Sequence, residues 1–460
     1  MPELLLPDHA ADVAAVLRAL LHGPVLRARL AALGGWADLP PAQEAAMLGA
    51  AFLHDIGKAN AGFQRKRLPE GGRGPVAGHV AEAAALLRLG SRAEVPVRGA
   101  DSYLDPWAPA GAYLLAALGH HGRPLPRDGL PDAARMARRV WQGDGAYEPV
   151  AAAEALIAAL HRWLPDAAAA MPDPEPPAAV LHAFAGLVSL ADWIASNDAA
   201  GFFPYPIEGD RWAFAVPRAA EVVAAMRFDL APARAELAAR APGFAQVFGV
   251  AAPTPVQKAM TDPSLGQVVL LEAATGSGKT EAALWRWQHL LREGAVDGLA
   301  FLLPTRTSAV QMYDRVGRAV AALWPDEAVR PNIVLAVPGY LRADGAEGTR
   351  LPGFRVLWDD DRGGARAHAR WAAESPRRGL AGAVVVGTVD QALMAALTTK
   401  HAHLRGACLL RHLLVVDEVH ASDAYMTELL RTLLARQVAA GGHALLLSAT
   451  LGAAARARVL

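Results

Sequence analysis

With 460 residues, the chain is too long for one hydrophobic core and should hold two or three domains. Its 45 basic and 45 acidic residues cancel, so a nucleic-acid contact would need a local basic groove rather than an overall positive charge. A single cysteine, Cys408, excludes disulfides and cysteine-type zinc sites, so metal ligands must be His, Asp or Glu. The N-terminus lacks a signal-peptide pattern, and we expect a cytoplasmic protein without a membrane partner.

Residues 1–200 predict a bundle of helices. They are rich in Ala and Leu with helical periodicity, and Pro- and Gly-rich segments divide them. The expected helices lie near residues 8–33, 41–60, 77–90, 110–121, 131–142, 150–162 and 178–197. This part is therefore predicted to be an all-α domain.

The rest of the chain predicts an α/β domain. Residues 201–245 begin with an aromatic, Pro-rich segment followed by a helix near 217–240, which we interpret as a linker or docking segment. Short apolar runs and helical stretches then alternate through 246–460, which indicates a parallel sheet with helices on both faces. Residues near 340–380 are interpreted as a surface insertion carrying an acidic run. The expected strands are 267–273, 299–304, 332–337, 383–387, 413–418 and 444–449.

A metal site is predicted around AFLHDIGK, residues 51–58. Adjacent His54 and Asp55 can bind divalent metals, because one carboxylate can bridge two ions. If the segment is helical, Lys58 reaches the same face and could hold an anionic substrate. Asp192 lies within an apolar helix, where a buried carboxylate needs a partner such as a metal.

The candidate ligands come from separate helices. They are His9, His54, Asp55, His79, His120, His121 and Asp192. Five histidines and two aspartates suit two five- or six-coordinate ions of Mn, Fe, Co or Ni. Two ions about 3.5–4 Å apart could activate water and stabilise in-line attack on a phosphodiester.

This order of residues resembles the HD phosphohydrolase superfamily, and HDIGK is the most specific part of the resemblance. The resemblance covers residues 1 to about 200. It implies hydrolysis of phosphoesters with one or two metal ions on a helical bundle. His54, Asp55 and Lys58 would then lie at the catalytic centre.

A phosphate-binding loop is predicted at LLEAATGSGKTEAAL, residues 270–284. The backbone N–H groups of such a loop cradle phosphates, while Lys279 reaches the terminal phosphates and Thr280 binds magnesium. Ala273 stands where a first glycine often occurs. The residues expected to bind ATP here are Thr275, Gly276, Ser277, Gly278, Lys279 and Thr280.

Two further strands end in polar residues that suit ATP hydrolysis. In LLVVDEVH, Asp417 would hold Mg²⁺ and Glu418 would polarise the attacking water. In LLLSAT, the hydroxyls of Ser448 and Thr450, together with His420, would relay the state of the nucleotide.

In this order the three motifs resemble the first RecA-like lobe of a superfamily 2 helicase. The resemblance implies that Gln257 of TPVQ reads the adenine edge. It also matches motif Ia with Thr305 and Arg306, and motif Ib with Thr388 and Asp390. These residues would contact the nucleic-acid backbone irrespective of its sequence.

An HD site directly ahead of a DEVH helicase lobe resembles the CRISPR-associated helicase-nuclease of type I systems. VGTVDQAL and DEVHASDAYM carry this resemblance, which covers the whole chain. It implies a single-stranded DNA nuclease coupled to an ATP-dependent helicase, recruited by a guide-RNA surveillance complex to the displaced strand of an R-loop. The family's second RecA-like lobe would lie beyond Leu460, so we expect DNA cleavage but little ATPase activity from this polypeptide.

Two other functions remain open. An HD nucleotide phosphohydrolase with a regulatory nucleotide-binding lobe would act on free nucleotides and not on DNA. An ATP-gated docking module would bind a guide-loaded complex without cleaving anything. Motifs Ia and Ib argue against both, because a small-molecule enzyme has no need of them.

Overall fold

Two compact units make up the computed structural model. The helical unit comprises Met1–Leu21 and Gly34–Ala220, and the sheet unit comprises His22–Leu33 and Glu221–Leu460. The structure describes residues 4–67, 74–89, 95–145, 147–197, 201–352, 356–359, 370–421, 423–450 and 456.

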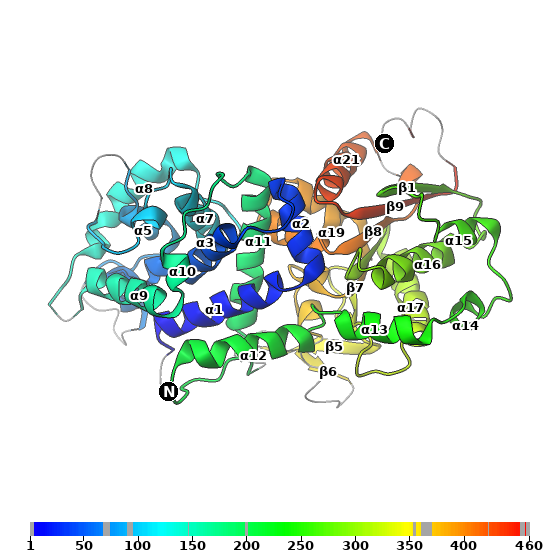
Figure 1. Ribbon diagram of the computed structural model, residues 1–460, viewed down its shortest axis with the longest axis horizontal. Coiled ribbons are helices and arrows are strands. Elements are labelled where there is room, and N and C mark those ends of the chain that lie inside the picture. Colours follow the sequence, from blue (N-terminus) through cyan, green and yellow to red (C-terminus); the bar gives the residue numbers. More distant parts are fainter. Residues whose placement is uncertain are drawn as a thin grey trace. The chain divides into compact units, whose positions relative to one another are not determined.

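The described part of the helical unit contains helices and turns, as predicted (Figure 1). Helices α1, α3, α7 and α11 pack against one another at its centre. The α-helices are α1 (Leu6–Leu21), α3 (Pro41–Phe52), α4 (Ala61–Gln64), α5 (Val80–Ala83), α6 (Asp101–Leu104), α7 (Pro109–Leu118), α8 (Leu130–Ala137), α9 (Pro149–Trp163), α10 (Pro165–Ala168), α11 (Ala178–Ala195) and α12 (Arg211–Ala225), which continues into the sheet unit. The 3-10 helices are η1 (Ile56–Ala59), η2 (Arg65–Arg67), η3 (Ala84–Leu86), η4 (Arg127–Gly129) and η5 (Arg138–Trp141).

Helix α11 is the central helix of this unit, and it is apolar on almost every side. Among the described helices it is long and apolar enough to cross a membrane, but most of its residues are buried within the unit. A helix that is hydrophobic all round is typical of a protein core. Asp192 therefore places a carboxylate inside apolar surroundings.

A buried ion pair fastens α12 to α1. The guanidinium of Arg211 donates from Nε to Oδ1 of Asp12 at 2.9 Å and from Nη2 to Oδ2 at 2.6 Å. Burial raises the pKa of Asp12 to about 6, although the charge and hydrogen bonds of Arg211 oppose this shift. Because each charge compensates the other away from water, losing either partner should be costly.

The single helix predicted for residues 8–33 is two helices in the structure. Gly23 and Pro24 separate α1 from α2 (Pro24–Gly34), because proline breaks a helix but is well suited to begin one. Most of α2 belongs to the sheet unit. Its buried Arg29 donates hydrogen bonds to backbone carbonyls of that unit, which are those of Ala295, Leu410 and Gly441.

The helix predicted for residues 41–60 also ends early, at Phe52. The N–H of His54 then bonds to the carbonyl of Ala51 at 3.3 Å, which tightens the chain into a turn. His54 and Asp55 lie in this turn, and Lys58 follows in η1 rather than in an α-helix. The turn, and not helical spacing, therefore determines which groups Lys58 can reach.

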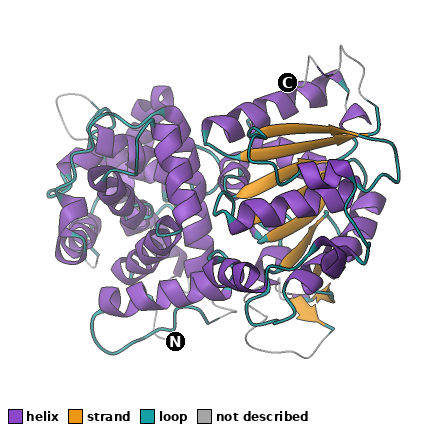
Figure 2. Ribbon diagram, turned by 45° about the vertical axis from the view of Figure 1, so that its right-hand side comes forward, coloured by secondary structure: helices purple, strands orange, loops and turns teal. Residues whose placement is uncertain are grey.

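The described strands of the sheet unit form one nine-stranded sheet in the order β1-β9-β8-β2-β7-β3-β4-β5-β6. Every strand predicted from the sequence is present, and these six strands pair with one another in parallel. Figure 2 shows helices on both sides of the sheet. These strands are β1 (Val268–Glu272), β2 (Gly298–Leu303), β3 (Ile333–Ala336), β7 (Val384–Thr388), β8 (His412–Val416) and β9 (His443–Ser448). The predicted fold class, an all-α bundle followed by a parallel α/β domain, is confirmed.

The helices of the sheet unit follow the predicted alternation with strands. Besides α2 they are α13 (Ala231–Arg240), α14 (Phe244–Phe248), α15 (Pro255–Ala259), α16 (Lys279–Arg292), α17 (Arg306–Leu323), α19 (Val389–Leu393), α20 (Ala402–Leu409) and α21 (Ala424–Ala439). The 3-10 helices are η8 (Trp371–Glu374), η9 (Gly379–Ala381), η10 (Met394–Ala396) and η11 (Val419–Ala421). The one helix predicted for 217–240 is divided into α12 and α13, because Arg227 adopts a positive φ of 62° between them.

The predicted surface insertion near 340–380 is partly an extension of the sheet. Strands β4 (Arg342–Ala343), β5 (Ala346–Arg350) and β6 (Val356–Trp358) add to it in antiparallel pairing. Trp371 is buried, so this region also contributes to packing. Of the acidic run, Asp359 is described, whereas Asp360 and Asp361 lie outside the described residues.

Candidate metal centre and nucleotide-binding loop

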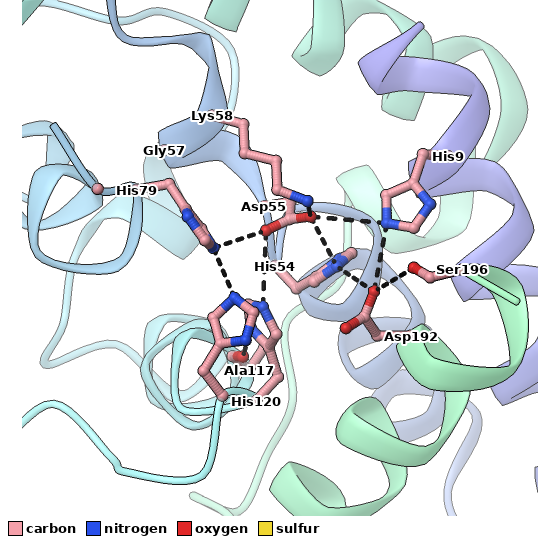
Figure 3. A network of polar contacts seen from close by, with 12 residues as sticks. His9, His54, Asp55, Gly57, Lys58, His79, Ala117, His120, Asp192 and Ser196 are labelled. Carbon is pink, nitrogen blue, oxygen red and sulfur yellow. Dashed lines mark hydrogen bonds and ion pairs between the residues drawn. The ribbon is translucent and has the colours of Figure 1, made fainter. Parts of the chain in front are cut away.

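The predicted metal ligands meet in the helical unit, although they come from five separate segments (Figure 3). His9 projects from α1 and Asp192 from α11, whereas His54 and Asp55 lie in the turn after α3. His79 is the residue before α5. His120 and His121 follow the C-terminal end of α7.

Two groups of ligand atoms share one carboxylate. In each group the ligand atoms lie within 4.8 Å of one another. Site A consists of His9, His54, Asp55 and Asp192, and site B consists of Asp55, His79, His120 and His121. Oδ2 of Asp55 faces Nε2 of His9 at 3.5 Å and of His54 at 3.3 Å, whereas Oδ1 faces Nε2 of His79 at 3.2 Å and of His120 at 3.6 Å. Asp55 is therefore placed to bridge two ions.

Several of these atoms are buried without a hydrogen-bond partner among the described residues. They are Nε2 of His9, His54 and His120 and both carboxylate oxygens of Asp55, although Oδ2 forms an ion pair with Lys58. Buried polar atoms normally have partners, because an unsatisfied one costs free energy. A divalent cation in each site would satisfy these atoms, and the nitrogen and oxygen ligands suit one. The residues therefore fit the metal site that their pattern predicts.

Backbone carbonyls orient two of the histidines. Nδ1 of His54 lies 2.7 Å from the carbonyl of Ala51, and Nδ1 of His120 lies 2.8 Å from the carbonyl of Ala117. When Nδ1 carries the proton and donates to these carbonyls, the lone pair of each Nε2 points into the cluster. The ends of α3 and α7 thus direct both Nε2 atoms into the cluster.

The charges of the cluster perturb the pKa values of its members strongly. Burial by itself lowers the pKa of His54, but the nearby Asp55 and Asp192 outweigh it and raise that pKa to about 10. Burial, with the neighbouring His54, lowers the pKa of His120 to about 3. Although burial opposes it, the histidines hold the pKa values of both Asp55 and Asp192 well below the usual range. Such opposed shifts are typical of functional sites.

Lys58 lies beside the shared carboxylate. Its Nζ forms an ion pair with Oδ2 of Asp55, and its side chain is partly exposed. The sequence singled out Lys58 for binding an anionic substrate, and its position beside the two sites is compatible with that expectation.

The phosphate loop connects β1 to the N-terminus of α16. Gly276 and Gly278 have φ values of 80° and 85°, which favour glycine, and residues 275–277 are exposed. Nζ of Lys279 donates to the carbonyl of Ala273 at 2.7 Å and to that of Ala274 at 3.3 Å. Thr280 is buried in the first turn of the helix.

The side chain of Gln257 is engaged by the protein itself. Its Oε1 accepts from the N–H of Thr254 at 2.9 Å, and its Nε2 donates to the carbonyl of Gly278 at 3.1 Å. It therefore caps α15 and reaches the phosphate loop in this structure. An adenine that uses the same amide must replace one of these bonds.

One histidine links the Glu418 carboxylate of DEVH to the Ser448 hydroxyl of SAT. Oε2 of Glu418 lies 3.2 Å from Nε2 of His420, and Nδ1 of His420 lies 3.1 Å from Oγ of Ser448. Burial raises the pKa of Asp417, partly offset by the N–H of Glu418 and by the charge of Lys279. Thr450, the last residue of SAT, is exposed.

The predicted DNA-contacting residues differ in their exposure to solvent. Thr305 caps α17, because its Oγ1 accepts from the N–H of Ser308 at 3.2 Å, and Arg306 beside it is exposed. Thr388 is buried at the end of β7, whereas Asp390 is exposed and accepts from Nε2 of Gln391.

Asn60 and Phe63, which lie beside His79, were not predicted from the sequence. The buried side chain of Asn60 bonds to the backbone beside His79, and the ring of Phe63 meets the His79 ring edge-on at a centroid distance of 5.3 Å. An Asn at the start of a short helix, two residues after HDIGK, was a signal for a cap but not for this role.

The fold and the site define a class of protein. Its members carry an HD-type metal site on a helical bundle, followed by a RecA-like helicase lobe. Residues 2–200 match a family described as "Cas3, HD domain", and residues 254–333 match "DEAD/DEAH box helicase".

Relatives span the whole chain. The chain is 31% identical to the CRISPR-associated endonuclease/helicase Cas3 of Thermus thermophilus, over 98% of this chain and 49% of that protein. A crystal structure of T. fusca Cas3 with AMPPNP matches with a TM-score of 0.67 and 23% identity, covering 99% of this chain and 49% of that one. A chain in a CRISPR RNA-guided surveillance complex, pre-nicking, matches with a TM-score of 0.57 and 24% identity, covering 99% of this chain and 46% of that one. Residues 2–200 thus match the Cas3 HD domain, and the chain is similar to Cas3 proteins along almost all of its length while spanning about half of theirs.

Proposed function

We propose that the chain is a metal-dependent nuclease acting on single-stranded DNA, joined to the first lobe of an ATP-dependent DNA helicase. The observation that carries this proposal is the carboxylate of Asp55, whose two oxygens face the ligands of site A and site B. Such a shared carboxylate suits phosphodiester hydrolysis with two metal ions. The match of the helical unit to an HD domain supports it.

In the nuclease, the residues of site A and site B would each hold one transition-metal ion. Bound ions of this kind lower the pKa of a coordinated water and stabilise charge on the attacking and leaving oxygens. Asp55 would keep both sites at a fixed separation, and the carbonyls of Ala51 and Ala117 would keep His54 and His120 oriented. The Lys58 ammonium would attract the scissile phosphate towards this centre.

In the helicase lobe, the phosphate loop would bind ATP with Mg²⁺ held by Thr280 and Asp417. Glu418 would polarise the attacking water, and its contact with His420 would pass the nucleotide state to Ser448. Exposed Arg306 and Asp390 lie after parallel strands at the edge that carries the phosphate loop, where DNA would track. Exposed Thr305 would contribute through its side chain, whereas buried Thr388 would contribute through its backbone.

The expected setting is CRISPR interference of type I in the cytoplasm. One solved relative belongs to a guide-RNA surveillance complex described as pre-nicking, and that title describes the relative. By analogy, a guide-RNA surveillance complex would recruit this enzyme to the displaced strand of an R-loop, which it would nick and then degrade.

We further propose that the 460-residue polypeptide, assayed alone, hydrolyses ATP slowly. Motors of this class hold ATP between two lobes, and an arginine supplied to the γ-phosphate accelerates hydrolysis about 10³–10⁵-fold. An arginine supplied in trans by a helicase lobe of a relative should therefore stimulate the ATPase of these 460 residues. Robust DNA-stimulated turnover by the chain alone would refute this part.

The test is cleavage of circular single-stranded DNA by metal-stripped protein after addition of Mn²⁺, Co²⁺, Ni²⁺ or Mg²⁺. We expect nicking with a transition metal, and its loss in Asp55→Ala; Lys279→Ala is the matched control and should cut as well as wild type. Free nucleotides are tested in parallel. Hydrolysis of nucleotides without any cutting of DNA would replace the nuclease proposal with a nucleotide phosphohydrolase.

A further inference from the structure

His79 is the ligand with the least support from regular structure. The other ligands lie within or directly after helices of at least ten residues, namely α1, α3, α7 and α11. His79 instead precedes α5, which has four residues. A ligand must be held closely in place to bind a metal well, so other groups have to position His79.

Asn60 contacts the backbone of two segments, the turn after Asp55 and the residues just before His79. Its Nδ2 donates to the carbonyl of Gly57 at 2.7 Å and to that of Gly78 at 2.8 Å, and the side chain is completely buried. Gly57 lies two residues after Asp55, and Gly78 directly precedes His79. One amide group therefore connects the turn that carries the shared carboxylate to the segment that carries the ligand of site B.

The oxygen of the same amide has a third role. Oδ1 of Asn60 accepts from the N–H of Phe63 at 2.8 Å and so begins α4. That helix places the ring of Phe63 edge-on against the ring of His79. All three hydrogen bonds of Asn60 thus act on the position of His79.

The backbone at this point is also closely packed. A Cβ atom on Gly57 would lie 1.8 Å from the carbonyl oxygen of His79, a separation that no two such atoms can adopt. The two segments therefore touch where Asn60 joins them, and a small displacement of either one moves His79 relative to Asp55.

We propose that Asn60 is a positioning residue for site B, and that its two N–H donors set how tightly the second metal ion binds. This inference deepens the proposed nuclease function and rests on it. Site A should depend little on Asn60, because the ligands other than Asp55 lie on α1, on α11 and at the end of α3. Loss of an outer contact of this type commonly weakens metal binding about 10–100-fold.

The test is calorimetric titration of the metal-free protein with Mn²⁺. Asn60→Asp keeps an oxygen acceptor for the N–H of Phe63 but removes both donors, so it separates positioning from helix capping. We expect wild type to bind two ions, and Asn60→Asp to bind one normally and the other about 10–100-fold more weakly. Normal binding of both ions by a folded Asn60→Asp protein would overturn the proposal.

A pair of double variants assigns the weakened ion to its site. In Asp192→Ala, which removes a ligand of site A alone, adding Asn60→Asp should weaken the remaining ion. In His121→Ala, which removes a ligand of site B alone, adding the same change should have no effect on the remaining ion. The opposite pattern would contradict the assignment.

The matched control is Gln43→Ala. Gln43 is also a completely buried amide of the helical unit, and it donates to the carbonyl of Pro174 and accepts from the hydroxyl of Tyr113, away from both sites. It should lose stability but keep both ions. If Asn60→Asp does not fold, Asn60→Ser replaces it, because serine also lacks the amide donors to Gly57 and Gly78, and unchanged binding of both ions would then refute the proposal. Absence of any metal binding by wild type would instead refute the proposed function.

Discussion

Arg29 gives a prediction about how the sheet unit is stabilised. Its guanidinium donates to the carbonyls of Ala295, Leu410 and Gly441. These three residues precede strands β2, β8 and β9, respectively. The bond to Leu410 is buried, and hydrogen bonds from a charged group contribute about 1.5–3 kcal/mol. Because water can reach the other two carbonyls in part, we expect Arg29→Ala to destabilise the sheet unit by about 3 kcal/mol.

Hydrogen exchange measured by mass spectrometry tests this value locally. A loss of about 3 kcal/mol corresponds to roughly 100-fold faster exchange in the strands that open together, here β8 and β9. Peptides from α11, in the helical unit, serve as an internal control. Arg431→Ala is the control variant, because Arg431 pairs with Glu428 on an exposed helix face and should contribute little. Unchanged exchange in β8 and β9 after Arg29→Ala would refute the reasoning.

Three further predictions concern single side chains. Arg211→Ala should destabilise the helical unit by about 3–5 kcal/mol at pH 7.5, because it leaves the buried charge of Asp12 without a partner. At pH 5 the loss should be smaller, because Asp12 with its raised pKa takes up a proton and is no longer charged. Urea unfolding at both pH values measures the two losses, and equal losses would contradict the prediction. Lys279→Ala should abolish binding of a fluorescent ATP analogue without changing the binding of Mn²⁺, and retained affinity for the analogue would contradict the role of the loop. Lys58→Ala should slow DNA cleavage about 10–100-fold while two ions still bind, and loss of an ion would show that Lys58 acts on the metal centre instead.

The sequence was sufficient for the fold class because its local signals agree with the final structure. Apolar runs of strand length produced the parallel strands within two residues of their predicted ends, and the Ala-rich half formed helices. The failures lie where tertiary contacts override a continuous pattern. Gly23 and Pro24 divide an apolar stretch that periodicity alone joins, and α2 then packs in the other unit.

That the candidate ligands meet in one cluster could be predicted for a similar reason. His54 and Asp55 are adjacent in the chain, and the remaining ligands lie on or at the end of helices whose apolar faces pack together. The residues that hold these ligands in place could not be predicted. Asn60, for example, acts through backbone carbonyls, which any residue provides. The engagement of Gln257 by Thr254 and Gly278 is likewise a matter of backbone geometry.

The most direct test of the account is a crystal structure of the protein soaked with Mn²⁺, with anomalous diffraction locating the metal. We predict two anomalous peaks about 3.5–4 Å apart, one within site A and one within site B, with Asp55 bridging them. A single peak, or two peaks that do not share Asp55, would contradict the proposal that one carboxylate organises a two-metal nuclease centre.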